Sequence, residues 1–237
     1  MVVICLLTGH FRSILIFTSL ILIHELGHFL CAYFLGWDCL KIEIFPYGGC
    51  SFFDSKINIP LWQEFLVLIM GPILQIIFIF ILSFIVSDKL FFLYLEYSNW
   101  ILIFNFLPIY PLDGGKLLFL FTSKFFSYYY SCSFIFGFSF FLSFFFLWIG
   151  LFITHNFIFF LVFIFLILKV LSEIEKINYY IQKFLMERYL FDFSFLKSKI
   201  IKNIKKMRRT KYHFFLEREK LYPEQEFLIK KIYKTKE

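Results

Sequence analysis

The chain alternates long apolar runs with short polar stretches. The long runs cover residues 14–35, 65–86, 90–107, 133–153 and 157–171, and a short one covers 2–8. A helix needs roughly 20 mostly apolar residues to cross a bilayer, so the run at 2–8 is too short alone and 157–171 is at the limit. The pattern predicts an all-α polytopic membrane protein with five to six transmembrane helices.

Composition agrees with this class and adds a division of the chain. The 237 residues are 60% hydrophobic and include 40 Phe, more apolar surface than a soluble domain of this length can bury. Residues 1–172 are close to neutral, so the net charge of +7 arises from residues 173–237. We therefore expect a membrane-embedded domain at 1–172 and a basic cytoplasmic tail at 173–237, in a multi-pass protein of the cell membrane.

The basic tail has a helical texture. In residues 197–209, apolar side chains recur at helical spacing among basic ones, at Ile200, Ile201, Ile204 and Met207. This predicts a basic amphipathic helix lying on the inner leaflet, and a solvated helix or a partly disordered tail is the alternative. Juxtamembrane basic segments contact anionic lipid more often than nucleic acid, so the expected partner is the bilayer and not nucleic acid.

The loop after the second apolar run has a strand-like pattern. Apolar and charged residues alternate over 40–44, a Pro-Tyr-Gly-Gly sequence breaks the pattern, and an apolar stretch resumes at 50–53. This predicts a short β-hairpin or re-entrant loop near the membrane surface. An exposed strand edge there could accept an extended substrate segment, and an ordinary tight loop is the alternative. The residues concerned are Pro46, Tyr47, Gly48 and Gly49.

The sequence His-Glu-Leu-Gly-His at 24–28 lies inside an apolar run. On a helix, His24 and His28 are four residues apart and project from one face, so both can bind one Zn²⁺. Glu25 stands beside that face and can take a proton from a zinc-bound water. Ionisable residues inside a membrane span are costly, which favours a functional site over the alternative of polar residues satisfied by packing.

A catalytic zinc needs a third protein ligand. The other histidines, His10, His155 and His213, lie before the helix, in an outer turn and in the tail. Among carboxylates, Asp113 stands out because prolines and glycines break the helix around it at 105–115, which suits backbone that lines a cavity at membrane depth. An interfacial helix cap before Gly114 is the alternative role for Asp113.

The motifs HELGH (24–28) and NFLPIYPLDGG (105–115) together resemble the paired signatures of the site-2 protease family, peptidase family M50. Residues 6–188 are more similar to one branch, the sporulation proteases of the SpoIVFB type, through LLTGH, LIHELGH, PYGG, MGPILQ, LPIYPLDGGKLLFL and FLMERY. The resemblance implies an intramembrane zinc metalloendopeptidase. In it, His24, His28 and Asp113 bind zinc, Glu25 is the general base, and Asn105 holds the substrate backbone or the oxyanion.

The resemblance also carries expectations about partners. It implies a membrane-associated protein substrate, with precursors of sporulation sigma factors as one candidate, and an inhibitory membrane partner. Gly71 and Pro72 match a kinked helix beside the site. Two departures from the branch are expected: only part of its first membrane span is visible at 2–8, and the residues after 189 are too few for its CBS domain.

Two other classes of function compete with the protease. A membrane metal carrier would need polar ligands along several spans, whereas 65–86 and 133–153 contain no His, Asp or Glu. An inactive protease-like scaffold would be expected to lack part of the catalytic set, whereas Glu25 and the three candidate ligands are all present. Both features favour the zinc protease.

Overall fold

The computed structural model describes residues 11–37, 39–45, 48–53, 57–154, 157–195, 197–217 and 219–234. It divides into two compact units, the first comprising residues 1–55 and 62–107 and the second residues 56–61 and 108–237. This division follows contacts within each unit and differs from the predicted boundary at 172, which stays a prediction about the membrane part and the tail.

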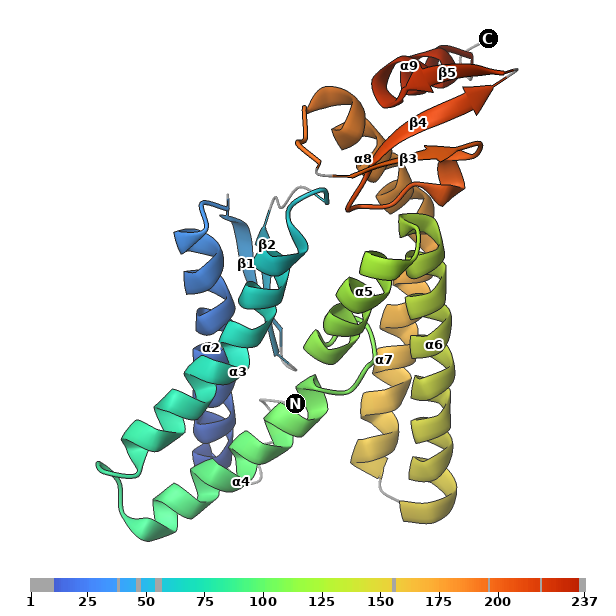
Figure 1. The fold of residues 1–237 in the computed structure, drawn as a ribbon. Coiled ribbons are helices and arrows are strands. Elements are labelled where there is room, and N and C mark those ends of the chain that lie inside the picture. Colours follow the sequence, from blue (N-terminus) through green and yellow to red (C-terminus); the bar gives the residue numbers. More distant parts are fainter. Residues whose placement is uncertain are drawn as a thin grey trace. The chain divides into compact units, whose positions relative to one another are not determined.

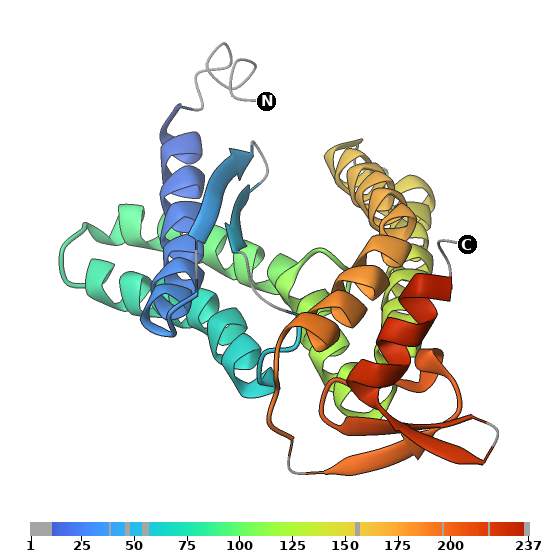
Figure 2. The ribbon, with the colours of Figure 1, turned by 90° about the horizontal axis from the view of Figure 1, so that it is seen from above.

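Within its described residues, the first unit contains three helices and a hairpin (Figure 1). Strand β1 pairs with β2 in antiparallel register, with Ile44 opposite Gly49 and Phe45 opposite Gly48, which confirms the predicted hairpin. Figure 2 shows the hairpin beside α2, which it contacts through β2. Pro46 and Tyr47 lie outside the described residues. The elements are α2 (Phe11–Phe34), β1 (Cys39–Phe45), β2 (Gly48–Phe53), α3 (Leu61–Leu82) and α4 (Asp88–Asn105).

A small apolar core joins the three helices of this unit. Ile16 and Leu20 of α2 pack with Ile79 of α3 and Ile101 of α4, and all four are buried. The predicted apolar runs at 14–35, 65–86 and 90–107 therefore do form helices, with bounds shifted by a few residues.

The second unit contains the remaining helices and a small sheet. Helices α6 and α7 run antiparallel, side by side (Figure 1). The elements are α5 (Asp113–Phe125), α6 (Tyr128–Ile149), a π-helical turn η1 (Gly150–Thr154), α7 (Phe157–Glu175), α8 (Ile177–Leu190), β3 (Ser198–Ile201), a 3₁₀ turn η2 (Ile204–Lys206), β4 (Tyr212–Glu217), β5 (Lys220–Pro223) and α9 (Glu224–Lys234).

The tail folds into a three-stranded sheet of order β3-β4-β5, so the prediction of an all-α chain with an amphipathic helix at 197–209 is wrong there. Strand β3 pairs in parallel with β4, from Ser198 opposite Tyr212 to Ile201 opposite Phe215. Ile201 and Met207 are buried in a core that Tyr128 of α6 shares, whereas Ile200 is exposed. Strand pairing and this core override the helical spacing of the apolar residues, because local propensity is weaker than tertiary packing.

The FLMERY sequence (184–189), near the end of α8, contains an arginine that contacts the tail. The Arg188 guanidinium is buried and donates to the carbonyl oxygens of Arg208 and Arg209 at 2.9 and 2.8 Å, with its planar face over the Phe195 ring. Its Nε donates to Asn58 Oδ1 at 2.6 Å. Burial lowers the pKa of Arg188 to about 10, so the group is still a cation at neutral pH. One side chain thus connects α8, the tail and the segment that precedes α3.

Three helices among the described residues are long and apolar enough to cross a membrane, namely Phe11–Phe34, Leu61–Leu82 and Tyr128–Phe152. Helices α4 and α7 form where further spans were expected, but α4 carries Asp88, Lys89 and Glu96. Five to six spans therefore remain a prediction, whereas a mostly helical membrane fold is confirmed. Exposed large apolar side chains cover the three spanning helices, as a lipid-facing surface requires.

Candidate metal centre

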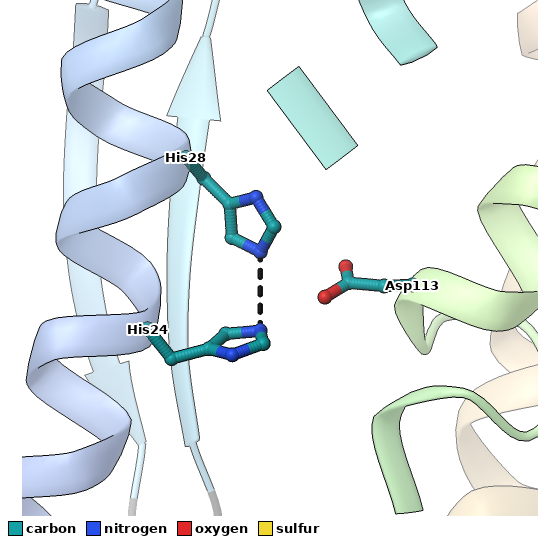
Figure 3. A group of neighbouring side chains, drawn as sticks. All are labelled: His24, His28 and Asp113. Atoms are coloured by element: carbon teal, nitrogen blue, oxygen red, sulfur yellow. Dashed lines mark hydrogen bonds between the residues drawn. The ribbon is translucent and has the colours of Figure 1, made fainter. Parts of the chain in front are cut away.

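The two histidines of the HELGH sequence project from one face of α2 (Figure 3). Both side chains are buried, and their rings meet edge to face at an interplanar angle of 81°. The Nε2 atoms of His24 and His28 are 3.2 Å apart. The helical spacing of four residues thus brings two imidazole nitrogens to one point, as the sequence predicted.

The outer nitrogen of each ring contacts an oxygen that serves as an acceptor. His24 Nδ1 lies 2.8 Å from Gln75 Oε1, and His28 Nδ1 lies 2.8 Å from the carbonyl oxygen of Val67. These oxygens accept hydrogen bonds, so each Nδ1 carries a proton and, in a neutral ring, Nε2 is the nitrogen with the lone pair. Both rings are therefore in the tautomer that can bind a metal through Nε2.

The orientation of the Gln75 amide follows from its other contacts. Its Nε2 donates to the Ser98 carbonyl oxygen at 3.2 Å and to Ser98 Oγ at 2.9 Å. Since a carbonyl oxygen accepts only, the amide nitrogen must face α4 and the amide oxygen must face His24. A polar chain from α4 through α3 to α2 thus fixes the tautomer of His24. The sequence analysis missed Gln75, although an amide within an apolar run was a usable signal.

Replacing Gln75 by Leu should lower the affinity for zinc 10- to 100-fold, the usual cost of losing the hydrogen-bond partner of a metal-ligating histidine. The measurement is competition for zinc between the purified chain and a chromophoric chelator. Gln75→Glu is the control, because it keeps an acceptor for His24 Nδ1 and should retain more of the affinity. Equal affinities for Gln75→Leu and the native chain would refute a role for Gln75 in positioning His24.

Helices α2 and α3 approach closely at the histidines. A Cβ on Gly27 would lie 2.4 Å from the Met70 carbonyl oxygen, and a Cβ on Gly71 would lie 2.4 Å from Cε1 and Nε2 of the His28 ring. No real side chain fits at such distances. Gly27 of HELGH and Gly71 of MGPILQ therefore lie at the same contact between α2 and α3. This contact places the His28 ring against α3. Pro72 lies inside α3 next to this contact, and the kink expected there stays a prediction.

The other predicted site residues of the first unit lie in α2, α4 and β2. Glu25 is half-buried and adjoins His24 in α2, Asn105 is the last residue of α4, and Gly48 and Gly49 begin β2.

Asp113, in the second unit, is the first residue of α5. It is buried, and its Oδ1 accepts a hydrogen bond from Lys116 Nζ at 3.3 Å. A carboxylate in the first turn is also favoured by the helix dipole, but the N-cap residue of α5 is Leu112 and no side-chain cap hydrogen bond forms there.

Figure 3 draws the three predicted ligands together. One ligand atom from each of His24, His28 and Asp113 lies within 4.8 Å of the others, and all three residues are buried. Two neutral imidazole nitrogens and one carboxylate oxygen are a donor set that zinc accepts in catalytic sites. A cation bound by both Nε2 atoms, which are 3.2 Å apart, would offset the repulsion between their lone pairs, so the residues present fit the metal.

Comparison with known proteins connects this site to a family. Residues 12–95 match Peptidase family M50. The Stage IV sporulation protein FB of Bacillus subtilis is 42% identical over 125 residues, which are 50% of this chain and 43% of that protein. A putative zinc metalloprotease of Synechocystis is 33% identical over 118 residues, 46% of this chain and 31% of that protein. The chain thus spans less than half the length of these relatives.

The fold is also similar to that of a solved structure. The site-2 protease from Methanocaldococcus jannaschii superimposes with a TM-score of 0.53 at 27% sequence identity, over 67% of this chain and 76% of that one. The similarity thus extends well beyond the residues of the family match. Residues 12–95 thus match the family M50 model, and the fold over two thirds of the chain is similar to that of a site-2 protease.

Proposed function

We propose that the chain is an intramembrane zinc endopeptidase that cleaves membrane-associated proteins. The observation that carries this proposal is the pair of buried imidazoles whose Nδ1 atoms are both held by oxygen acceptors and whose Nε2 atoms meet at 3.2 Å. Burying two polar imidazoles in an apolar helix costs free energy, and binding of a metal ion would offset that cost.

In this proposal His24, His28 and Asp113 are the protein ligands, and each has a defined task. Gln75 and Val67 hold the Nδ1 atoms of the two imidazoles, so the Nε2 atoms are the ring nitrogens that face the metal position. Zinc bound by these residues would polarise a peptide carbonyl and make water a nucleophile near neutral pH. Glu25, next to His24 on α2, accepts the proton of the attacking water and later passes it to the leaving amine. Asn105 donates its amide to the developing oxyanion or to the substrate backbone.

The hairpin is the proposed entry point for substrate. In a two-stranded sheet each strand keeps one unpaired edge, and the hairpin of β1 and β2 packs beside the helix that carries the histidines. An extended substrate segment can add to such an edge through backbone hydrogen bonds. An extended segment presents its peptide bonds to a metal centre, which a helix does not.

The substrate class follows from the membrane location. The proposed substrates are membrane-associated proteins, and precursors of sporulation sigma factors are the first to be tested, in view of the similarity to the Stage IV sporulation protein FB. We further propose a multi-pass protein of the cell membrane with its basic C-terminal tail in the cytoplasm, as the positive-inside rule favours. An inhibitory membrane partner would act by blocking access to the same site.

Removal of the metal tests the proposed activity. The full chain, purified in detergent, should shorten a tagged sigma-factor precursor or casein, lose that activity after treatment with 1,10-phenanthroline, and regain it with about one equivalent of zinc per chain. Cleavage that persists without metal would refute the proposal. Absence of cleavage together with zinc bound at several sites per chain would favour a metal carrier instead.

A further inference from the structure

The tail contains a segment of unusual charge. Residues 197–211, the basic segment, contain eight Lys and Arg and no Asp or Glu. Arg209 is buried and belongs to the interior of the tail. The basic side chains of the segment that are exposed to solvent are those of Lys197, Lys199, Lys202, Lys205 and Lys206. The surface around β3 and η2 therefore presents five ammonium groups with no acidic residue in the segment to neutralise them.

The basic segment is fastened to one end of a membrane-spanning helix. Ser127 Oγ donates to the Lys205 carbonyl oxygen at 2.7 Å, and the Tyr128 N–H donates to the Met207 carbonyl oxygen at 2.9 Å. Met207 itself is buried against Tyr128. The ammonium of Lys205 lies 4.8 Å from the centre of the Tyr129 ring. The lysines of η2 are thus held at the first turn of α6.

This end of α6 lies at the level of the bilayer surface. The helix is one of the candidate spans, and it starts with Tyr128, Tyr129 and Tyr130, whereas Trp148 stands near its other end. Tyrosine and tryptophan gather at the two interfaces of a bilayer, so these aromatic residues mark its boundaries. The backbone bonds to Ser127 and Tyr128 therefore fix the basic segment at headgroup height.

The structure also provides an apolar surface beside the lysines. A small hollow lies between the start of α6, α8 and η2, and its lining includes Tyr129, Leu185, Ile204 and Lys205. A free phosphate needs cations alone, whereas a phospholipid at the interface presents a phosphate next to apolar carbon. A lysine in the lining of an apolar hollow, Lys205, suits the second ligand.

We propose that the basic segment binds the headgroups of anionic phospholipids and holds the tail against the membrane. The partner is the lipid bilayer, because the segment is built onto the interfacial end of a spanning helix. Each lysine near an anionic surface contributes roughly a five-fold gain in affinity, so the five exposed lysines form a substantial contact.

The test compares two double variants of the full chain in neutral detergent micelles. Lys202→Gln with Lys206→Gln removes two exposed charges from the basic segment. The matched control, Lys220→Gln with Lys230→Gln, removes two charges from β5 and α9, where Lys230 makes an exposed ion pair with Glu217 and lies over the Tyr222 ring. The readout is the binding of fluorescent phosphatidylglycerol and phosphatidylcholine, at low and high salt.

We expect the native chain to bind phosphatidylglycerol in preference to phosphatidylcholine, with an affinity that falls as salt rises. The basic-segment variant should lose about 20-fold in that affinity, and the control should stay near the native value. Equal binding of both lipids, or unchanged affinity in the basic-segment variant, would overturn the proposal.

Two competition arms separate other ligands of the same charge. Displacement of phosphatidylglycerol by an equal concentration of inorganic phosphate would overturn the proposal in favour of a phosphate site. Binding of a poly-glutamate peptide without binding of lipid would overturn it in favour of an acidic protein partner. Neither result depends on the proteolytic activity, so this test is independent of the proposed function.

Discussion

Replacing Glu25 by Gln should abolish proteolysis while leaving the metal in place. The substitution keeps the size of the side chain and removes its ability to accept a proton, and loss of a general base costs about 10²- to 10⁴-fold in rate. The measurement is shortening of a tagged sigma-factor precursor during co-expression, combined with zinc analysis of the purified chain. We expect no shortening and an unchanged zinc content, because Glu25 is not one of the proposed ligands.

The control for this variant is Glu96→Gln. Glu96 is an exposed residue of α4 in the same unit, and its replacement removes the same charge away from the histidines' helix. It should cleave at the native rate. Native-like cleavage by Glu25→Gln would exclude Glu25 as the base and, with it, the proposed mechanism. Loss of zinc from Glu25→Gln would instead assign Glu25 to metal binding.

Replacing Gly71 by Ala should reduce zinc binding and cleavage together. A methyl group there would lie 2.4 Å from two atoms of the His28 ring, so the ring must move or the helices must separate. A displacement of about 1 Å in a catalytic group costs on the order of 100-fold in rate. The measurements are zinc affinity by chelator competition and cleavage rate, with helix content monitored by circular dichroism.

The matched control is Gly137→Ala. Gly137 lies in the interior of α6, where an added Cβ meets no atom within 4 Å. Alanine is intrinsically better than glycine in a helix by about 1 kcal/mol, so both variants gain helix propensity and only Gly71→Ala introduces the collision. Native zinc affinity in Gly71→Ala would show that α2 and α3 can separate without cost, contrary to the close packing seen here.

Much of the site could be predicted from sequence because it depends on short-range spacing. Two histidines four residues apart on one helix must share a face, so the pair His24 and His28 followed from the helix period alone. The hairpin followed from alternation over 40–44 and the glycines after it. The third ligand, Asp113, was indicated by the helix-breaking residues around it and by resemblance, since spacing carries no information across such a distance.

The tail shows where local patterns mislead. Ile200, Ile201, Ile204 and Met207 recur at helical spacing, yet they form a strand and a 3₁₀ turn. Pairing of β3 with β4, and burial of Ile201 and Met207 beside Tyr128, contribute more than the helix propensity of a short basic segment. These partners lie elsewhere in the chain, so the segment itself held no sign of them.

The sequence by itself determined the membrane class, the order of the helices and the chemistry of the metal ligands, because apolar run length and residue type are local properties. Only the tertiary structure decided which groups hydrogen-bond to the two histidines and how their rings are oriented. Gln75 and Val67 reach them from α3, Ser98 orients Gln75 from α4, and Gly71 makes room for a ring. Each of these contacts joins residues far apart in the chain, and such contacts depend on packing, which no local pattern encodes.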